Sequence, residues 1–259
     1  MSKCYILSEF RLHKVTAGVD GDLLATDINV APIQLPGSTF IKNMIITING
    51  REVFNANQLY SYKSYLDTEL SYPKHVKESF LSCAGYAADG WDQDAIDDNG
   101  FKARNKMFLA NKNVQFITNI DADLFAQDLY LINNCELDIE ISPQPDEFML
   151  IQPATNNNTY RLELVNIKLY VKMIELMDGL SLDLARRLEI KPARYSMRKS
   201  MLKSLFISEG RFEYNANIFT DEVPLRIIIG LLDTDFNFKN FNVRNISIVA
   251  NGRNYPQTV

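Results

Sequence analysis

The stretch of residues 111–152 constrains the fold more than any other part of the chain. Within it, Leu137, Ile139 and Ile141 alternate with acidic residues, which is the period expected of a β-strand with one buried face. An apolar run at 114–117 precedes this strand, and another at 148–151 follows a Pro-Gln-Pro break suited to a turn. No apolar run here is long enough to indicate a helix. The sequence therefore predicts a sheet-forming centre.

Composition agrees with a folded, β-rich protein. The 259 residues are enough for one large β domain or two ordinary domains, and 46% of them are apolar. Fifteen Phe and twelve Tyr against one Trp favour β packing. The net charge of -5 argues against a protein whose whole surface coats nucleic acid.

The cysteines and the apolar runs indicate the compartment. Cys4, Cys83 and Cys135 are odd in number and widely spaced, so they encode neither a disulfide framework nor a metal knuckle. This usage fits a reducing compartment, the cytosol or the nucleus. The opening residues have no long apolar core, and no later run approaches the length of a membrane span. We therefore expect neither a signal peptide nor a membrane span.

The first third of the chain contains a strong hairpin signal. Residues 4–15 read as a strand and are followed by a loop with Gly18 and Gly21. Residues 40–53 contain apolar runs on both sides of an Asn-Gly pair at 49–50. A type I′ turn needs positive φ at both central residues, which Asn-Gly tolerates, so we expect strand, tight turn and strand.

Residues 57–84 break the β pattern. Apolar residues recur there at three- and four-residue steps, first before Pro73 and then after it, which predicts two amphipathic helices. The first stripe comprises Leu59, Tyr62, Leu66 and Leu70, and the second comprises Val76, Phe80 and Cys83. We expect this helical insertion to lie outside the sheets, with its stripe packed on a sheet edge or on a neighbouring subunit.

Residues 87–100 hold five Asp and two Gly, a composition compatible with a calcium loop. No window there has the D-x-[DN]-x-[DN]-G start of an EF-hand, because Ile96 or Asp97 falls where another residue is required. We therefore interpret the segment as a solvated loop.

Farther along, residues 160–176 form a strand candidate whose apolar phase switches near Val165, which predicts a β-bulge. Residues 180–190 have leucines at helical spacing and end before Pro192. Residues 193–208 are open to either strand or helix. The apolar run 225–232 suits a strand buried on both faces.

Two segments share one template, N-x5-N-G-R with an apolar strand inside. They lie at 43–51 and 245–253, and each is preceded by a basic residue and a Phe. This spacing is too long for a solenoid and suits two copies of a β-sandwich domain. Two unrelated hairpins with a common turn remain the alternative.

Catalytic motifs are missing from the sequence. Only His13 and His75 could serve as imidazole bases, and there is no G-x-S-x-G, H-E-x-x-H, P-loop or G-x-G-x-x-G pattern. A carboxylate pair for glycoside hydrolysis stays open, but nothing selects one. We therefore expect no enzyme activity and no catalytic, cofactor-binding or metal-binding residues.

A basic cluster between residues 186 and 203 has few aromatic residues interleaved with it. A solvated or subunit-facing surface is therefore favoured over nucleic-acid binding. The cluster comprises Arg186, Arg187, Lys191, Arg194, Arg198, Lys199 and Lys203.

Three segments resemble the major capsid proteins of Polinton (Maverick) elements and related viruses. The first, LDTELSYPKHVKESFL, matches the family's helical segment at Tyr65, Leu66, Leu70, Tyr72, Lys77, Ser79 and Leu81. The central stretch matches at Asp123, Leu124, Phe125, Gln127, Leu131, Asn133, Leu137 and Ile139. The third segment matches at Pro224, Gly230, Asp233, Phe238, Phe241, Asn242, Val243, Asn251 and Gly252.

The resemblance implies an all-β fold of two jelly-roll β-sandwiches side by side, with short helical insertions. Residues 1–176 would form the first jelly roll, with the helical insertion at 57–84. Residues 177–259 would form a linker helix and the N-terminal part of the second. Compared with the family, the first jelly roll lacks its opening strand and the second is truncated, so we expect an incomplete copy.

The function implied by the resemblance is structural. The chain would be a protomer of homotrimeric, pseudo-hexagonal capsomers in the icosahedral capsid of a double-stranded DNA virus or virus-like transposon. Its partners would be further copies of itself and a minor or penton single jelly-roll protein, with no sequence-specific nucleic-acid binding. It would be made in the host cytoplasm, with the nucleus open as the place of assembly. A non-catalytic β-sandwich that binds carbohydrate or protein is the alternative.

Overall fold

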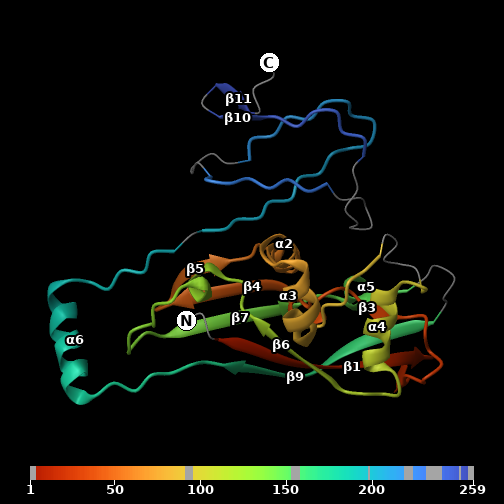
Figure 1. The fold of residues 1–259 in the computed structure, drawn as a ribbon, viewed down its shortest axis with the longest axis horizontal. Coiled ribbons are helices and arrows are strands. Elements are labelled where there is room, and N and C mark those ends of the chain that lie inside the picture. The colour runs from red at the N-terminus through yellow and green to blue at the C-terminus, as the bar shows by residue number, and fades with distance from the viewer. Residues whose placement is uncertain are drawn as a thin grey trace. The chain divides into compact units, whose positions relative to one another are not determined.

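The computed structural model describes residues 4–90, 96–152, 158–197, 199–218, 224–231, 241–250 and 252–255. The chain divides into two compact units, Met1–Ser204 and Leu205–Val259, called here the first and the second unit. Antiparallel β-sheet is the main architecture of the first unit (Figure 1). No helix among these residues has the length and apolar character needed to cross a bilayer.

Strands and short helices alternate along the first unit. In order they are β1 (Tyr5–Thr16), β2 (Val19–Asp22), β3 (Ala31–Pro32), α1 (Pro36–Thr39), β4 (Ile41–Ile48), β5 (Arg51–Asn55), α2 (Tyr60–Ser71), α3 (Lys74–Ser79), η1 (Phe80–Ala84), α4 (Asn99–Phe108), β6 (Val114–Asn119), η2 (Asp123–Ala126), β7 (Leu137–Pro143), α5 (Asp146–Met149), β8 (Leu150–Ile151), β9 (Thr159–Tyr170) and α6 (Asp178–Ile190).

Strand β1 is the hub of the first sheet. It pairs with β9 from Tyr5 to Val15, and both β6 and β2 pair on its other side, at 5–10 and 13–16 respectively. Buried and half-buried residues alternate along β1, as expected for a strand that covers a core. The strand prediction at 4–15 is thus confirmed. The organising strand, however, is β1 rather than the stretch 111–152, which contributes β6 to this sheet and β7 to another.

Strands β5, β4 and β7 form the second sheet in that order. The β4–β5 connection is the predicted tight turn: Ile48 pairs with Arg51, and Asn49 and Gly50 have φ of 49° and 73°. In β7 the apolar residues 137, 139 and 141 are half-buried while the acidic residues between them are exposed, so the predicted alternation is also confirmed.

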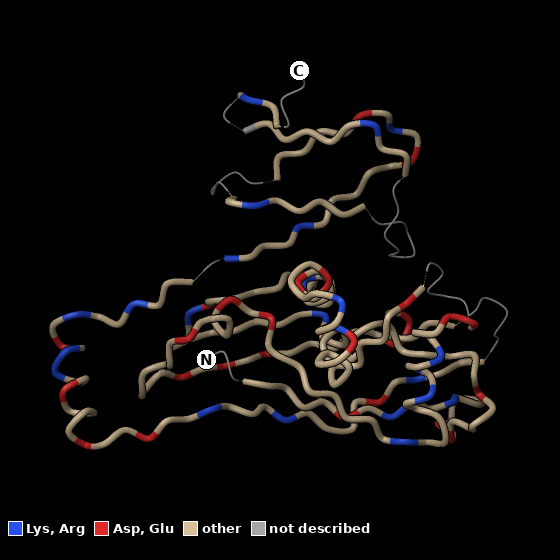
Figure 2. Tube along the Cα trace, in the orientation of Figure 1, with Lys and Arg blue, Asp and Glu red and all other residues tan. Residues whose placement is uncertain are grey.

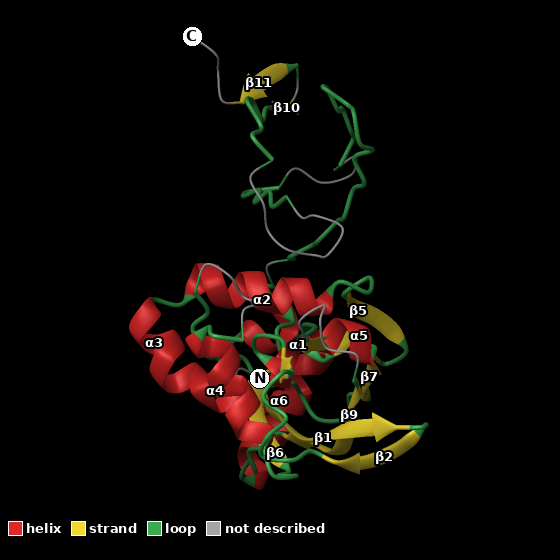
Figure 3. Ribbon diagram, turned by 90° about the vertical axis from the view of Figure 1, so that its right-hand side faces the viewer, coloured by secondary structure: helices red, strands yellow, loops and turns green. Residues whose placement is uncertain are grey.

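One apolar core joins the two sheets. It contains Ile6 and Phe10 of β1, Phe116 of β6 and Met44 and Ile46 of β4. Figure 3 shows α2, α3 and α4 gathered beside these strands. Antiparallel sheets that share a core in this way are compatible with a β-sandwich.

The helical insertion forms α2, α3 and η1, which confirms helices within 57–84, but the buried face differs from the prediction. In α2 the buried residues are Tyr60, Ser61, Ser64 and Thr68, whereas Leu70 of the predicted stripe is 53% exposed. Small polar side chains allow close approach to β4, and Ser61 Oγ donates a hydrogen bond to the carbonyl of Ile41 at 2.7 Å. In the second helical segment, Leu81 and Ala84 are buried in place of Phe80 and Cys83.

Two local assignments change in the structure. Residues 99–108, of which the first two belong to the predicted loop, form α4, with Phe101 and Phe108 fully buried. The run 148–151 is only partly strand, because Asp146–Met149 is a helical turn and β8 is limited to Leu150–Ile151. Strand β8 pairs with β3 in a separate small sheet.

The predicted bulge in β9 is confirmed. Glu9 of β1 pairs with Asn166, and the next residue, Phe10, pairs with Leu164, so Val165 is the extra residue. The strand ends at Tyr170, earlier than the predicted 176.

Helix α6 confirms the prediction for 180–190, and every one of its residues is exposed. The described residues of 193–208 have neither helix nor strand.

In the second unit, β10 (Ile248–Ala250) and β11 (Arg253–Tyr255) form the hairpin expected at the second template. The predicted strand at 225–232 is wrong for its described part: residues 225–231 have no regular structure, and Leu225 and Ile229 are exposed. The run has no strand partner among the described residues, so local apolar character alone does not make it a strand. Residue 232 lies outside the described residues.

Candidate functional site

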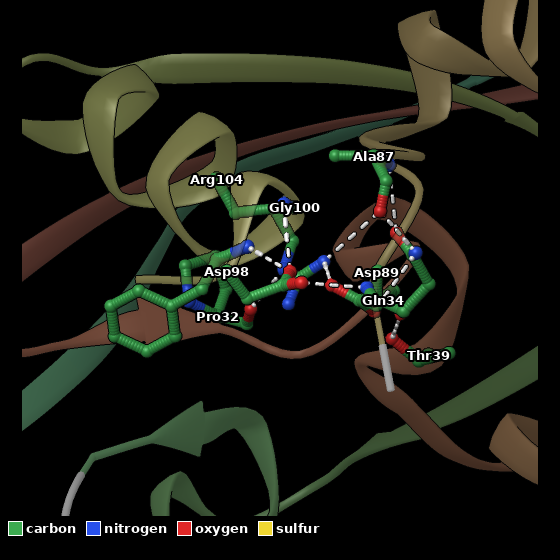
Figure 4. Close-up of polar contacts among 10 residues, drawn as sticks. Pro32, Gln34, Thr39, Ala87, Asp89, Asp98, Gly100 and Arg104 are labelled. Atoms are coloured by element: carbon green, nitrogen blue, oxygen red, sulfur yellow. Dashed lines mark hydrogen bonds and ion pairs between the residues drawn. The ribbon is translucent and has the colours of Figure 1, made fainter. Parts of the chain in front are cut away.

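The first place where chemistry gathers is a polar cluster around the guanidinium of Arg104 (Figure 4). Arg104 comes from α4 and is completely buried. Its Nε donates to the carbonyl of Pro32 at 2.8 Å, and its Nη1 donates to Asp89 Oδ1 at 2.5 Å and to the carbonyl of Ala87 at 3.2 Å. One side chain therefore ties α4 to β3 and to the loop that precedes the helix.

Gln34 completes this Arg104 cluster from the opposite side. Its Nε2 donates to Asp89 Oδ2 at 3.1 Å and to the carbonyl of Ala87, while its Oε1 accepts from the backbone N–H of Ala87 at 2.8 Å. Both oxygens of Asp89 thus have donors. Burial raises the pKa of Asp89 above its usual range, and the charge of Arg104 offsets part of that rise.

Asp98 fixes the start of α4. Its carboxylate accepts from the backbone N–H groups of Gly90, Gly100 and Phe101 at 2.6, 2.8 and 3.2 Å. Desolvation acts to raise the pKa of Asp98, but the three N–H donors together lower it below its usual value. The interpretation of 87–100 as a solvated loop is therefore wrong for Asp89 and Asp98, because one is a buried ion-pair partner and the other is an N-cap.

The Arg104 cluster is built to hold the fold. Each oxygen of Asp89 accepts a hydrogen bond, one from Arg104 and the other from Gln34, so the carboxylate is engaged within the fold. Among the residues that the structure describes, no group of three His, Cys, Asp or Glu side chains is placed to hold a metal ion. The chemistry of this cluster is thus the attachment of α4 and its preceding loop to the sheets.

A second polar site lies where β6 leads into the next loop. The carboxylate of Asp121 accepts a hydrogen bond from Ser64 of α2, and its backbone N–H donates to the hydroxyl of Tyr60 at 2.9 Å. Burial raises the pKa of Asp121 to about 6, although the Ser64 hydrogen bond and the charge of Lys63 oppose the shift. The adjoining cavity holds about 50 Å³ and is lined by Tyr5, Ser64, Thr68, Leu81 and Asp121, among others. That volume suits a water molecule or two and not a metabolite.

The two histidines lie where the sequence placed them, one on a strand and one in the first turn of a helix. His13 Nε2 is 2.8 Å from Glu163 Oε2 across the β1–β9 pair. The hydrogen bond from His13 lowers the pKa of Glu163. His75 lies in α3, remote from this pair in the fold. The His13–Glu163 contact is a cross-strand pair of the kind that stabilises a sheet.

The most extensive candidate site is apolar. It runs along the outer edge strand β9, through the extended segment 171–177 and into α6, and we call it the β9–α6 surface. Strand β9 pairs with β1 on one side and has no strand partner on the other among the described residues. The exposed large apolar residues of this surface are Leu164, Val165, Ile167, Leu169, Tyr170, Val171, Met173, Ile174, Leu176, Met177, Leu180, Leu182, Leu184, Leu188 and Ile190. The sequence predicted a strand at 160–176 and a helix at 180–190, and the exposure of their apolar side chains is seen only in the structure.

In the first two segments that carry the capsid-protein resemblance, motif residues have clear structural roles, whereas Asp233, Phe238 and Asn251 of the third segment lie outside the described residues. Lys77 pairs with Glu69, linking α3 to α2, and its ammonium lies 5.8 Å from the centre of the Tyr86 ring. Leu124 and Phe125 are buried in the core. Asp123 accepts hydrogen bonds from the backbone N–H and Oγ of Ser200 at 2.8 and 3.0 Å. These motif residues thus attach helices and the later chain to the sheets.

The basic cluster at 186–203 is exposed at all of its described members. It begins within α6, where Arg187 Nε lies 2.9 Å from Asp183 Oδ2. Arg198 lies outside the described residues. That this cluster forms a solvated or subunit-facing surface, and not a nucleic-acid surface, stays a prediction.

Among curated proteins, the chain is similar to "Uncharacterized protein F54H12.2" of Caenorhabditis elegans, with 30% identity over 274 residues. The alignment covers 99% of this chain and 64% of the relative, so the chain spans less than two thirds of the relative's length. No protein-family profile matches the chain, and no solved structure matches it.

Proposed function

We propose that the chain is a structural protein, a protomer of an icosahedral capsid built from double jelly-roll subunits. The observation that carries the proposal is the β9–α6 surface: a long edge strand without a second neighbour, continuous with an exposed apolar helix. The resemblance of three segments to Polinton-type major capsid proteins supports the same conclusion from the sequence.

The β9 edge calls for a partner on physical grounds. An unpaired strand edge presents backbone N–H and C=O groups to any passing strand, and soluble monomers usually protect such edges with charges, proline or short length. Strand β9 is twelve residues long, and from its middle to its C-terminal end it carries exposed Leu164, Val165, Ile167 and Leu169. Contiguous apolar patches of this kind are typical of surfaces that are covered by another protein. Covering this surface with further subunits would satisfy both the backbone and the side chains.

The two Asn-Gly hairpins support two related sandwiches. The hairpins at 43–51 and 245–253 have the same cross-turn pairing, Ile48 with Arg51 and Ala250 with Arg253. On the proposed fold they are equivalent turns of two jelly rolls. The first unit would hold the first sandwich, and the second unit would hold part of the second.

The proposed assembly has several further parts. Three copies would form a pseudo-hexagonal capsomer, and capsomers would join one another and a minor single jelly-roll protein to make the shell. The protein would be made in the host cytoplasm and would end in the virion capsid. Burial of surface between subunits would be its whole mechanism, with no catalytic step.

The test is the state of the purified chain in solution. Size-exclusion chromatography with light scattering is expected to show trimers, and negative-stain electron microscopy is expected to show pseudo-hexagonal particles. A matched control changes Ile167 and Leu169 on the exposed part of β9 to Lys, which is expected to shift the chain toward monomer while preserving its circular dichroism spectrum. A monodisperse monomer of the unchanged chain that binds a glycan on an array would contradict the proposal and favour the binding-module alternative.

A further inference from the structure

Helix α6 has a ridge of exposed leucines whose spacing suits packing against another helix. Leu180, Leu184 and Leu188 are four residues apart and therefore form one ridge along the helix. They are 46%, 39% and 36% exposed, so the ridge has no cover from the described residues. Ridges at this spacing interlock with a like ridge in the commonest class of helix pair.

One flank of the ridge carries an acidic and a basic residue, so this flank is complementary to a reversed copy of itself. Asp183 and Arg187 lie four residues apart on the same flank and form an ion pair at 2.9 Å within the helix. Figure 2 shows that α6 carries both signs of charge. The flank thus holds an acid nearer the N-terminus and a base nearer the C-terminus.

From these two features we infer that α6 pairs with α6 of a second copy of the chain, antiparallel about a two-fold axis near Leu184. The inference rests on the proposed function in that it assigns this contact to assembly between copies. It adds a specific two-fold contact to the proposed trimer, and a three-fold particle cannot satisfy that contact internally in all three subunits, so the contact joins separate particles.

The antiparallel arrangement follows from symmetry. With the axis at Leu184, that residue meets its own copy, and Leu180 meets Leu188 of the second copy. The same flank of each helix then faces the other with its direction reversed, so Asp183 comes within about 3 Å along the axis of the second copy's Arg187. A parallel two-fold pair would instead put the two Asp183–Arg187 flanks on opposite sides of the contact, where they could not pair with each other.

The contact is expected to be weak by itself. Helix α6 has only thirteen residues, so a pair of them buries less than the roughly 1,000 Å² of a stable interface. Repetition across a shell would strengthen it, because many weak contacts made together act at high effective concentration.

Cysteine cross-linking tests the axis directly. In the full chain with Cys83→Ser and Cys135→Ser, the variant Leu184→Cys places a thiol next to its own copy. The matched control, Leu182→Cys, lies on the opposite face of the same helix and is 62% exposed. Mild oxidation is expected to link Leu184→Cys into dimers about tenfold faster than Leu182→Cys, because a disulfide requires close Cα atoms. Equal rates would overturn the inference.

Charge variants test the direction of the pair. Asp183→Arg makes both charges of the flank basic, and Arg187→Asp makes both acidic. Each variant alone is therefore expected to dimerise about fivefold more weakly in sedimentation equilibrium. Mixing the two variant chains is expected to restore association, because an all-basic flank then faces an all-acidic one. Failure of the mixture to associate would overturn the antiparallel assignment.

The same samples separate this inference from the proposed function. If the Leu184→Cys chain forms trimers or shells but no disulfide-linked dimers, the α6–α6 contact is contradicted and the proposed capsid function is not. A Leu184→Cys chain that forms no disulfide dimers, together with an unchanged chain that stays monomeric, would overturn both.

Discussion

The two Asn-Gly hairpins share a template and a turn but differ in burial. In the β4–β5 hairpin, Met44 and Ile46 are completely buried. In the β10–β11 hairpin, Val249 is 67% exposed, and Ile246 just before it is 46% exposed. The pairing across the turn is the same in both, since Ile48 meets Arg51 and Ala250 meets Arg253.

The difference shows which level of structure the template determines. Asn-Gly sets the first turn because both residues accept positive φ, and the glycine of the second template, Gly252, has positive φ as well. Burial comes from elsewhere: β4 has β7 on its second edge and the opposite sheet over its face. The hairpin of the second unit has no third strand among the described residues. The turn is therefore a local property, and the core is a property of the layers.

The largest expected effect on stability comes from removing a charged side chain, because the two units differ most in the burial of their arginines. Arg104 is completely buried, whereas Arg253 of the second hairpin is exposed. Arg104→Met leaves Asp89 buried without its ion-pair partner, so we expect a loss of about 3–5 kcal/mol in the free energy of unfolding. Arg253→Met is expected to change it by less than about 0.5 kcal/mol. Urea unfolding measures both.

A double variant shows whether the loss at Arg104 comes from the unpaired charge. Arg104→Met combined with Asp89→Asn is expected to be more stable than Arg104→Met alone, because the amide removes the buried carboxylate. A double variant no more stable than the single one would show that packing, and not the ion pair, makes Arg104 important.

The next largest effect is expected when an apolar side chain is truncated in each of the two hairpins. Ile46→Ala removes a buried side chain between the two sheets and is expected to cost about 2–5 kcal/mol. Val249→Ala in the second hairpin is expected to cost less than about 0.5 kcal/mol in a dilute, unassembled sample. Urea unfolding of both variants gives the two values, and a similar cost at both sites would contradict the difference in burial.

The partly buried carboxyl of Asp121 in the first unit predicts a pH effect. Because burial raises the pKa of Asp121 to about 6, the folded state binds the proton more tightly than the unfolded state does. The contribution of Asp121 to stability is therefore full below about pH 4 and is lost as the pH rises through 6, by up to about 3 kcal/mol. Asp121→Asn is expected to remove this slope from the pH profile of the free energy of unfolding.

Ser64→Ala provides the control for this slope. It deletes a hydrogen bond that favours the charged form of Asp121, so the decline between pH 4 and 6 should steepen relative to the unchanged protein. A profile identical in all three proteins would show that Asp121 is solvated.

The smallest expected loss of stability comes from substituting the turn glycines, and it should be equal in the two hairpins. Gly50 and Gly252 have φ of 73° and 75°, and a Cβ atom added at either would meet nothing within 4 Å. Alanine at each position should therefore cost about 1 kcal/mol through backbone strain alone. Hydrogen exchange of the amides flanking each turn reads the local loss, and unequal losses would show that packing affects one of the turns.

Much of the local structure could be predicted from the sequence, because turns, bulges and caps depend on neighbouring residues. The Asn49-Gly50 turn, the bulge at Val165 and the helix ending before Pro192 are examples. Which face of α2 is buried could not be predicted from apolarity, since the small residues Ser61 and Ser64 allow closer approach to β4 than the leucine stripe does.

The Arg104 cluster was missed for a related reason. Asp98 is followed by Gly100 and by aromatic residues at helical spacing, a signal that marks an N-cap and a buried stripe. The charged residue in the middle of that stripe hides the pattern, because arginine is seldom buried. Its partner Asp89 lies fifteen residues earlier, across a loop whose path the sequence does not specify.

The bulge at Val165 has a consequence for how β9 can move. A long edge strand can in general slide along its neighbour by two residues at a time, because each side chain then stays on its original face. In β9 such a slide would carry the extra residue into a position that β1 now uses for pairing, and the ladders on both sides of Val165 would have to break together. The strand is thus locked against slippage, and every molecule offers a neighbour the same sequence of outward-facing groups at the same height along the edge.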